Sequence, residues 1–332
     1  MVTNLTTTID WNKATQTLDE AQSILLVTHL SPDGDAIGSL LGLANALRER
    51  GRPVQAAVDG GVPGFLRFLP GSETVGAELT SGEWDVMVSL DSSDEPRSGL
   101  AGEYGRAHSK LVINVDHHPT NTRFGDVHVI MPEAVSTTEI VYRWLEQMGH
   151  PISREIAVPL LTGLLTDTNG LRTSNVRSTT LGIAQRLMDA GASLTEITQR
   201  TLSSTPFKTI RLWGRVLPRV ELADGIIQAT IYQQDYRDIK ATEQTAGGIV
   251  EFLLKANEAM VSVVFRELED GQVEVGFRSK PGYDVSRIAV QIGGGGHRQA
   301  SGATIPGPVE AARERVIPLL REVVAQGSLI IA

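Results

Sequence analysis

The chain has 332 residues, of which 41% are hydrophobic and 21% are charged, and its formal net charge is −9. That length exceeds the usual size of a single domain, so we expect two domains. The acidic balance gives no support to stable binding along duplex nucleic acid, and the absence of cysteine excludes disulfides, thiolate zinc sites and iron–sulfur clusters.

The N-terminal segment lacks the basic stretch and apolar core of a secretory signal. The longest apolar runs fall short of the roughly 20 residues that a membrane-spanning helix needs. We therefore expect a cytoplasmic protein without a membrane partner.

Short apolar strands alternate with a helical pattern in the first part of the chain. We predict strands over 23–28, 54–59, 85–91 and 111–118, and a helix over 36–51. This alternation is typical of an α/β domain, in which helices cover a parallel sheet. Open sheets of this kind bind their ligands at the carboxyl ends of the strands.

The next part of the chain is mainly helical, with predicted helices over 136–149, 154–168 and 178–192. Ser136 and Glu139 form a capping box at the start of the first of them, and that helix N-terminus could also meet a phosphate.

The strand pattern restarts after Pro206 and Pro218. We predict strands over 226–232, 260–268 and 272–279, and helices over 247–257, 284–292 and 307–324. The predicted organisation is a parallel-sheet domain at 1–200, a linker at 201–218, and a smaller α+β domain at 219–332.

Polar clusters lie at the ends of the predicted strands of the first domain. The stretch "HLSPDGD" at 29–35, Asp91, the triplet "DHH" at 116–118 and Asp167 carry them. Taken alone, Asp33 and Asp35 could be a turn and a helix N-cap. Asp167 within an apolar helix is harder to dismiss, because an unpaired buried carboxylate is costly.

Taken together, the clusters fit a two-metal site better. Imidazole and carboxylate ligands without thiols suit Mn²⁺, Mg²⁺ or a similar divalent ion. Two ions about 3.5–4 Å apart require a bridging carboxylate, for which the strand-end Asp91 is suited. Within the triplet, one imidazole can bind metal while an acidic neighbour holds its tautomer, and the other histidine can face substrate.

The stretches "HLSPDGDAIGS", "SLD", "VDHHPTN" and "LLTDT" resemble four successive motifs of the DHH phosphoesterase superfamily. The stretch "FRSKPGYDVSRIAVQIGGGGHRQASGA" at 277–303 resembles the DHHA1 domain with its glycine-rich motif. The resemblance therefore covers nearly the whole chain, and it is greatest to bacterial oligoribonucleases that also dephosphorylate 3′-phosphoadenosine 5′-phosphate (pAp).

The resemblance implies six metal ligands, which in chain order are His29, Asp33, Asp35, Asp91, His117 and Asp167. His29 and Asp33 would bind one ion, and Asp35, His117 and Asp167 would bind the other. Asp91 would bridge the two ions. Asp116 would support His117, and His118 would contact the scissile phosphate, so that Asp91, Asp116 and His118 form the catalytic set. The resemblance also implies Mn²⁺ as the preferred ion, with Mg²⁺ or Co²⁺ as alternatives.

A glycine run at 293–296 lies in the part of the second domain that we expect to bind substrate. On its own such a run could be a flexible turn, but its backbone can also approach and cradle an anion. With the nearby cations and the resemblance, we expect substrate contacts from Arg172, Arg278, Ser279, Gly294, Gly295, Gly296, His297 and Arg298. A base could stack on Tyr283 or on the plane of Arg298.

We therefore expect a hydrolase that degrades short oligoribonucleotides and dephosphorylates pAp. Its substrates would be short RNA or DNA oligonucleotides and nucleotide bisphosphates. The alternatives are a phosphodiesterase for cyclic di-AMP or pApA and a single-strand exonuclease of the RecJ type; the glycine-rich second domain disfavours an inorganic pyrophosphatase. A nucleotide-binding sensor with a vestigial site is the non-enzymatic alternative, against which the complete ligand set argues. The sequence fixes neither cleavage polarity nor oligomeric state, and a homodimer stays open.

Overall fold

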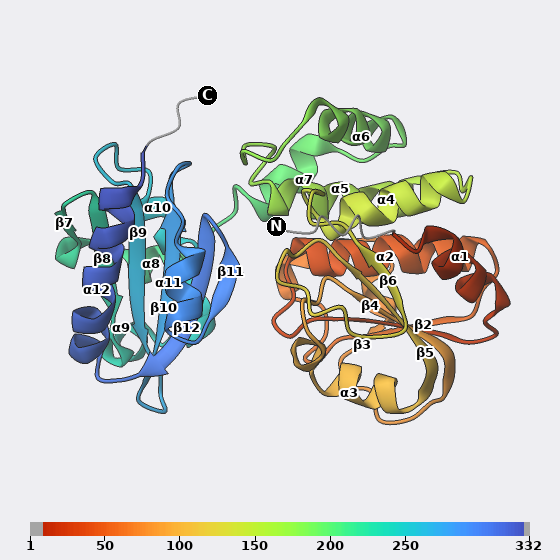
Figure 1. The fold of residues 1–332 in the computed structure, drawn as a ribbon, viewed down its shortest axis with the longest axis horizontal. Helices are drawn as coiled ribbons and strands as arrows, with labels where there is room; N and C mark the ends of the chain where they lie inside the picture. Colours follow the sequence, from red (N-terminus) through yellow and green to blue (C-terminus); the bar gives the residue numbers. More distant parts are fainter. Residues whose placement is uncertain (1–8, 329–332) are drawn as a thin grey trace, which may run out of the picture. The chain divides into compact units, whose positions relative to one another are not determined.

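The structure is a computed structural model, and it describes residues 9–328. The chain divides into two compact units, the first ending at Ser204 and the second beginning at Thr205 (Figure 1). The segment predicted as a linker, 201–218, includes helix α8 (Phe207–Val216), which belongs to the second unit. No helix of the described chain is long and apolar enough to cross a membrane.

The first unit contains a six-stranded sheet in the order β3-β2-β1-β4-β5-β6, and every pairing in it is parallel. Its strands are β1 (Ile24–Thr28), β2 (Val54–Ala57), β3 (Val75–Gly76), β4 (Trp84–Leu90), β5 (Ser109–Asp116) and β6 (Val127–Ile130). The central strand β1 is buried along its whole length, as its continuous run of Ile, Leu and Val predicts for a strand covered on both faces. Leu26 pairs with Ala56 on one side and with Val88 on the other.

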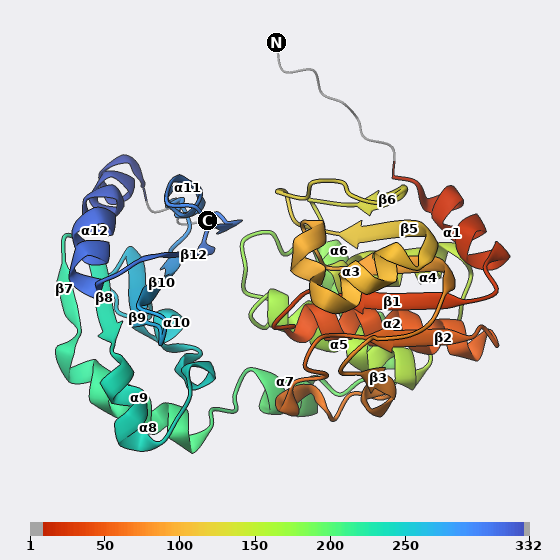
Figure 2. The ribbon, with the colours of Figure 1, turned by 90° about the horizontal axis from the view of Figure 1, so that it is seen from below.

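Helices cover both faces of this sheet, as Figures 1 and 2 show. The helices of this unit are α1 (Trp11–Glu20), α2 (Gly34–Glu49), α3 (Gly99–Ala107), α4 (Thr137–Gln147), α5 (Arg154–Asp167), α6 (Ser178–Asp189) and α7 (Leu194–Thr201), with short 3₁₀ turns η1 (Gly64–Leu66), η2 (Ser72–Thr74) and η3 (Glu95–Ser98). Helices α6 and α7 pack against α5 on the side away from the sheet. Helix α3 packs on one face against a small core. The larger core lies on the other face, where α2 contacts the sheet and α5.

Glycines let α2 and α5 approach each other closely. A Cβ at Gly38 of α2 would lie 2.5 Å from the carbonyl oxygen of Pro159 in α5, and a Cβ at Gly163 of α5 would lie 2.9 Å from Cα of Asp35 in α2. Because the first turn of α2 and the last turn of α5 both carry predicted ligands, this contact sets the distance between them.

The second unit has a mixed sheet in the order β11-β12-β10-β9-β8-β7, with β8 and β9 parallel and the other pairs antiparallel. Its strands are β7 (Glu221–Ala223), β8 (Ile226–Ile231), β9 (Val261–Glu267), β10 (Gln272–Ser279), β11 (Gly295–His297) and β12 (Ala300–Pro306). The remaining elements are α9 (Gln233–Ile239), α10 (Ile249–Leu253), α11 (Ser286–Gln291), α12 (Val309–Gln326), η4 (Leu217–Arg219) and η5 (Glu243–Ala246).

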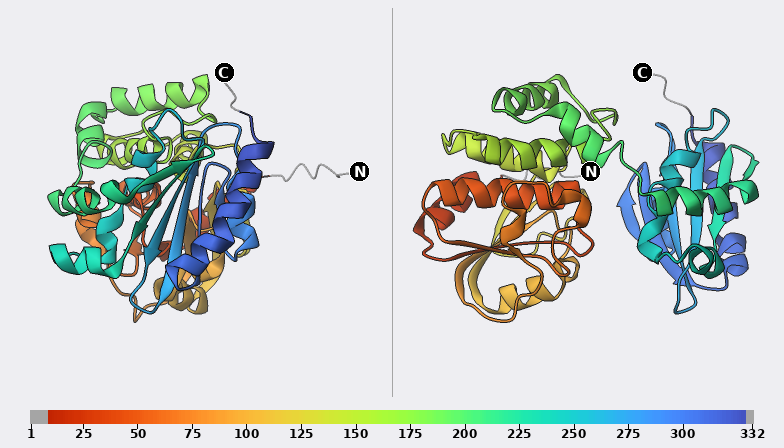
Figure 3. Two further views of the ribbon diagram at one scale, coloured as in Figure 1. Left: turned by 90° about the vertical axis from the view of Figure 1, so that its left-hand side faces the viewer. Right: turned by 180° about the vertical axis from the view of Figure 1, so that it is seen from behind.

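Each face of this second sheet has its own core. Helices α11 and α12 pack on one face, and α8, α9 and α10 pack on the other (Figure 3). The predicted fold class, a parallel-sheet domain followed by a smaller α+β domain, is confirmed.

Candidate metal centre

The predicted ligands converge at the carboxyl edge of the first sheet. His29 directly follows β1, Asp91 directly follows β4, and Asp116 is the last residue of β5. The other acidic ligands come from helix ends, Asp33 as the N-cap of α2, Asp35 in its first turn and Asp167 as the last residue of α5. Parallel strands therefore deliver the side chains to one edge, where α2 and α5 bring the rest.

These side chains form two groups whose donor atoms lie within 4.8 Å of one another. One group is His29, Asp33 and Asp91, and the other is Asp35, His117 and Asp167. Asp91 lies between them, because its Oδ2 is 3.5 Å from Nε2 of His29 and its Oδ1 is 3.7 Å from Nε2 of His117. The structure thus brings together the residues that the two-metal interpretation assigns to each ion, with Asp91 between the two groups.

The N-terminus of α4 holds two of these carboxylates. The backbone N–H of Thr137 donates to Oδ2 of Asp35 at 2.6 Å, and that of Thr138 donates to Oδ1 at 2.9 Å. The Thr137 hydroxyl donates to Oδ1 of Asp91 at 2.8 Å. Positive charge at a helix N-terminus stabilises a carboxylate there. The helix start that we considered for a phosphate thus binds the Asp35 carboxylate instead.

The predicted cap of α4 is confirmed in part. The Ser136 hydroxyl accepts from the backbone N–H of Glu139 at 3.1 Å, but the Glu139 carboxylate accepts from the N–H of Val135, one residue before the cap.

Among the described contacts, Asp116 bonds His118, whereas we expected it to support His117. Its Oδ1 lies 2.7 Å from Nδ1 of His118, and its Oδ2 accepts from the amide of Asn121 at 2.6 Å. Nδ1 of His117 lies 3.4 Å from the carbonyl oxygen of Ala134 instead. The strand end turns between Asp116 and His118 so that these two side chains, and not the adjacent pair, meet.

The electrostatics of the cluster favour bound cations. Burial and the negative charges of Asp91 and Asp167 raise the pKa of Asp35 well above its usual range. Partial burial and the charges of Asp33 and Asp91 likewise raise the pKa of Asp167. Carboxylates that resist ionisation because other carboxylates surround them are stabilised by any positive charge placed between them.

Nearby groups of opposite charge stabilise the ionised forms of Asp91 and His118. Burial would raise the pKa of Asp91, but its contact with His29 and the nearby histidines lower that pKa overall. Burial disfavours the protonated form of His118, yet its hydrogen bond to Asp116 and the charge of Asp91 outweigh burial and raise the pKa of His118 to about 9.

Strained backbone surrounds the centre. Asp91 has a φ of 59°, in the left-handed region that non-glycine residues rarely occupy, and Ser31, Asn169 and Leu171 have φ values of 53°, 49° and 64°. All four lie on loops that carry a predicted ligand or directly follow one. Such strain persists where surrounding structure fixes it and is concentrated at functional sites.

The donor set fits divalent ions. Carboxylate oxygens and imidazole nitrogens without thiolates bind Mn²⁺, Mg²⁺ and related ions, and the two groups share one buried carboxylate, as paired ions require. The ligand types do not discriminate among these metals.

The predicted substrate residues of the second unit have protein partners. Nη2 of Arg278 lies 2.6 Å from Oε1 of Glu251. Nε of Arg298 lies 3.2 Å from Oδ2 of Asp284. The buried Ser279 donates its hydroxyl to the carbonyl oxygen of Tyr283 at 2.7 Å. Base stacking on Tyr283 is ruled out, because its side chain lies in the hydrophobic core and is only 8% exposed.

The glycine run has a structural reason in the second sheet. Gly295 to His297 form the edge strand β11 and pair with β12, where a turn was one expectation. A Cβ at Gly294 would lie 2.0 Å from the carbonyl oxygen of Gly302, and Gly296 has a φ of 130°. Side chains are therefore excluded at these two positions by the fold itself.

In the first unit, the described side-chain hydrogen bonds of Arg172 are made to Asn169, within the same loop. Its Nη2 donates to Oδ1 of Asn169 at 2.9 Å, and its Nε donates to the Asn169 carbonyl at 2.7 Å. The phosphate contact expected of Arg172 therefore stays a prediction.

Sequence reasoning missed two residues that hold the centre. Asn121 orients Asp116, and Thr137 contacts both Asp35 and Asp91. Asn121 lies within the stretch "VDHHPTN", so its position in this motif could have identified it from the sequence. For Thr137, the only indication in the sequence was its position next to the helix cap Ser136.

Comparison with known proteins identifies a family model that matches each of the two units. Residues 23–164 match the DHH family, N-terminal domain, and residues 225–326 match the DHHA1 domain. The chain is 37% identical to the bifunctional oligoribonuclease and PAP phosphatase NrnA of Thermus thermophilus, over 90% of this chain and 89% of that one. The Bacillus subtilis protein of the same name is 29% identical over 87% of this chain and 91% of its own length.

A solved structure shares the whole fold. The crystal structure of an exopolyphosphatase-related protein from Bacteroides fragilis superimposes with a TM-score of 0.86 at 26% identity, covering 95% of this chain and 97% of that one.

Proposed function

Since the chain belongs to the DHH family, with a DHHA1 domain after the DHH N-terminal domain, we propose that it is a metal-dependent phosphoesterase that degrades short oligoribonucleotides to mononucleotides and dephosphorylates pAp to AMP. The observation that carries the proposal is the pair of ligand groups around Asp91 at the carboxyl edge of the first sheet. The names of the relatives support the substrate class, and the acidic net charge agrees with short substrates more than with long polymers.

His29, Asp33 and Asp91 would hold one divalent ion, and Asp35, His117, Asp167 and Asp91 the other. Two such ions supply positive charge that activates a water and neutralises phosphoryl oxygens. Thr137 and the α4 N-terminus orient the carboxylates of Asp91 and Asp35, so that both ion positions are fixed before substrate binds.

His118 is the residue that we assign to the scissile phosphate. Asp116 holds its Nδ1, and Asn121 in turn holds Asp116, so the ring orientation and the tautomer are fixed. The hydrogen bond to Asp116 and the charge of Asp91 raise the pKa of this imidazole, which favours the form that donates to a phosphate oxygen and assists departure of the leaving oxygen.

In the second unit, we propose that Arg278, Ser279, His297 and Arg298, with the backbone of Gly294 to Gly296, bind the substrate end away from the cleaved bond. Arg278 would exchange its partner Glu251 for a phosphate. Arg172 in the first unit keeps its proposed phosphate contact, which requires it to leave Asn169.

We propose Mn²⁺ as the working ion and the cytoplasm as the site of action. Rates with Mn²⁺, Mg²⁺ and Co²⁺ added to chelator-treated protein test the choice of metal. Equal or higher activity with Mg²⁺ would contradict it.

A substrate panel tests the reaction. With Mn²⁺ present, a five-nucleotide RNA, pAp, pApA, pGpG and cyclic di-AMP are compared by product mass. We expect mononucleotides from the RNA and AMP from pAp. Turnover confined to cyclic di-AMP or pApA would favour the cyclic-dinucleotide alternative, and rapid degradation of long single-stranded DNA would favour the exonuclease of the RecJ type. Tight nucleotide binding without turnover would favour the sensor.

Asp91→Ala tests the centre itself. Loss of the shared carboxylate should abolish metal-dependent hydrolysis of both RNA and pAp, because both ion positions lose a ligand. Full activity in this variant, with both substrates, would refute the two-metal proposal.

A further inference from the structure

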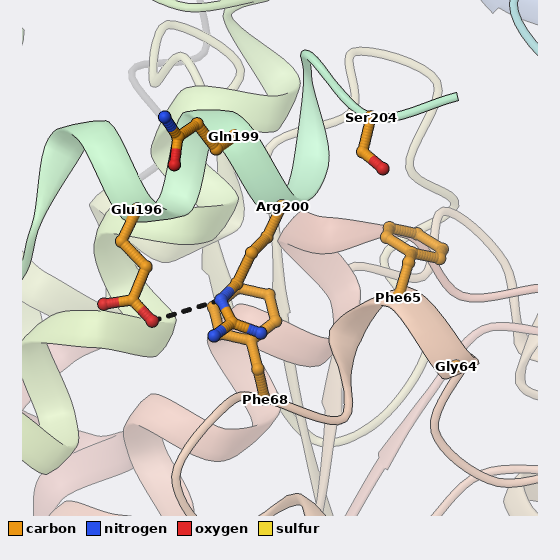
Figure 4. A pocket seen from close by; sticks show the side chains of 7 residues that line it. All are labelled: Gly64, Phe65, Phe68, Glu196, Gln199, Arg200 and Ser204. Atoms are coloured by element: carbon orange, nitrogen blue, oxygen red, sulfur yellow. Dashed lines mark hydrogen bonds and ion pairs between the residues drawn. The ribbon is translucent and has the colours of Figure 1, made fainter. Parts of the chain in front are cut away.

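The first unit contains a cavity that the metal centre does not use. It lies between η1 and α7, has a volume of about 500 Å³, and is lined by Gly64, Phe65, Phe68, Glu196, Gln199, Arg200 and Ser204 (Figure 4). Ligand sites in proteins commonly have volumes of about 300–1,000 Å³, so the cavity is large enough for a nucleoside.

One aromatic ring of the cavity is open and the other is covered. The guanidinium of Arg200 lies over the Phe68 ring, 5.0 Å from its centroid, and Nε of Arg200 is 3.1 Å from a carboxylate oxygen of Glu196. Phe65, on the opposite side beside Ser204 in Figure 4, is 52% exposed. An exposed aromatic ring beside a cavity can serve as a platform on which a base stacks.

The polar groups of the cavity suit a neutral ligand with hydrogen-bonding edges. Glu196 balances the charge of Arg200, so the cavity does not select an anion. Within the described chain, neither the Gln199 amide nor the Ser204 hydroxyl has a hydrogen bond to protein. An amide offers both donors and an acceptor, and a hydroxyl offers one of each kind, which matches the edge of a nucleobase.

Chain connectivity links both walls of the cavity to segments that lead to the metal centre. On one wall, η1 lies in the connection after β2, and β2 pairs with β1, the strand that His29 directly follows. On the other wall, Cδ1 of Leu202 lies 3.3 Å from the place of a Cβ at Gly170, three residues after Asp167. Extended-chain lengths then place Ser204 within roughly 30 Å of Asp167, which a short oligonucleotide can span.

We infer that this cavity is a subsite in which a nucleobase of a bound oligonucleotide stacks on Phe65, while its phosphodiester lies at the metal centre. The inference rests on the proposed function and adds a substrate contact within the first unit. The inference also predicts that only one of the two proposed substrates uses the cavity. The single base of pAp stays near the metal centre, where its phosphate is cleaved, whereas an oligonucleotide has further bases that reach the cavity.

The test is steady-state kinetics of Phe65→Ala on a five-nucleotide RNA, a dinucleotide and pAp. We expect KM for the five-nucleotide RNA to rise about tenfold, because a stacked base contributes that much or more, with kcat unchanged. KM for pAp should stay at the wild-type value. Phe65→Trp should retain the low KM for RNA, because indole stacks at least as well as phenyl.

Leu100→Ala is the matched control, since Leu100 is another apolar side chain, 74% exposed, on α3. It should leave KM for all three substrates unchanged. An unchanged KM of Phe65→Ala for the five-nucleotide RNA would overturn the subsite, and so would an equal rise for RNA and pAp. Wild-type inactivity towards both substrates would instead overturn the proposed function, so the two failures are distinguishable.

Discussion

At the scale of single residues, the centre depends on side chains that touch no substrate. Thr137 is fully buried and bonds Asp35 through its N–H and Asp91 through its hydroxyl. One residue therefore fixes the shared carboxylate and a ligand of the second group. Partners that orient metal ligands commonly contribute a factor of about 10–100 to metal affinity.

Thr137→Val keeps the size of the side chain and the backbone contact but removes the hydroxyl. We expect Mn²⁺ affinity to fall by roughly tenfold or more, measured by calorimetric titration of the apoprotein, with Thr137→Ser restoring it. Thr138→Val is the matched control, because the Thr138 hydroxyl bonds Ser136 and its contact with Asp35 is through the backbone. Equal affinities in the two valine variants would show that the Thr137 hydroxyl does not orient Asp91.

At this scale, some features of the site could be predicted from the sequence and others could not. The convergence of the proposed ligands His29, Asp91 and His117 at one edge of the sheet was predictable, because a parallel sheet brings its carboxyl ends together. The pairing of Asp116 with His118 depended on how the chain turns after β5. The burial of Tyr283 depended on the packing of α11 and α12, which no local pattern specifies.

At the scale of elements, the long apolar strands and helices of the first unit were predicted to within a few residues. Helix α3 was missed because its sequence, GLAGEYGRA, contains three glycines and little apolar periodicity. Strand β11 was missed because glycine disfavours strands when only propensity is considered, whereas its close pairing with β12 requires glycine.

The contact between α2 and α5 makes an element-scale prediction. Gly163→Ala would place a Cβ 2.3 Å from Cγ2 of Thr138 and 2.8 Å from Oδ1 of Asp35. We expect the free energy of unfolding to fall by about 1–3 kcal/mol, as for other overpacked cores, and the Mn²⁺-induced rise in Tm to shrink as Asp35 is displaced.

Gly182→Ala is the control for that change. Gly182 lies within α6, and a Cβ there would meet nothing within 4 Å, so alanine should stabilise the protein by about 0.5–1 kcal/mol. Urea unfolding with and without Mn²⁺ measures both variants. A Gly163→Ala protein as stable and as responsive to Mn²⁺ as the wild type would contradict the account of this helix crossing.

At the scale of the whole molecule, the two units each have their own hydrophobic cores, and we propose that catalysis belongs to the first and substrate grip to the second. The ligand groups belong to the first unit, and the proposed phosphate contact of Arg278 belongs to the second. A change in the second unit should therefore affect extended substrates selectively.

Arg278→Ala should raise KM for a dinucleotide about tenfold or more, the usual effect of losing one charge-assisted hydrogen bond. KM for bis-(p-nitrophenyl) phosphate, which has no distal nucleotide, should change far less. Arg321→Ala removes another arginine of the second unit, one that pairs with Asp224, and should leave both values unchanged. An equal loss on the two substrates in Arg278→Ala would argue against a distal grip.

The left-handed backbone at Asp91 has a consequence for the evolution of such proteins. An aspartate at a φ of 59° costs of order 1 kcal/mol compared with a glycine, which adopts this conformation freely. Selection for hydrolysis keeps the aspartate in place despite that cost. Once a gene copy is released from that selection, a change to glycine relieves the strain and removes the shared carboxylate in a single step. Glycine at this position would therefore be an early mark by which descendants that have ceased to be enzymes could be told from those that have not.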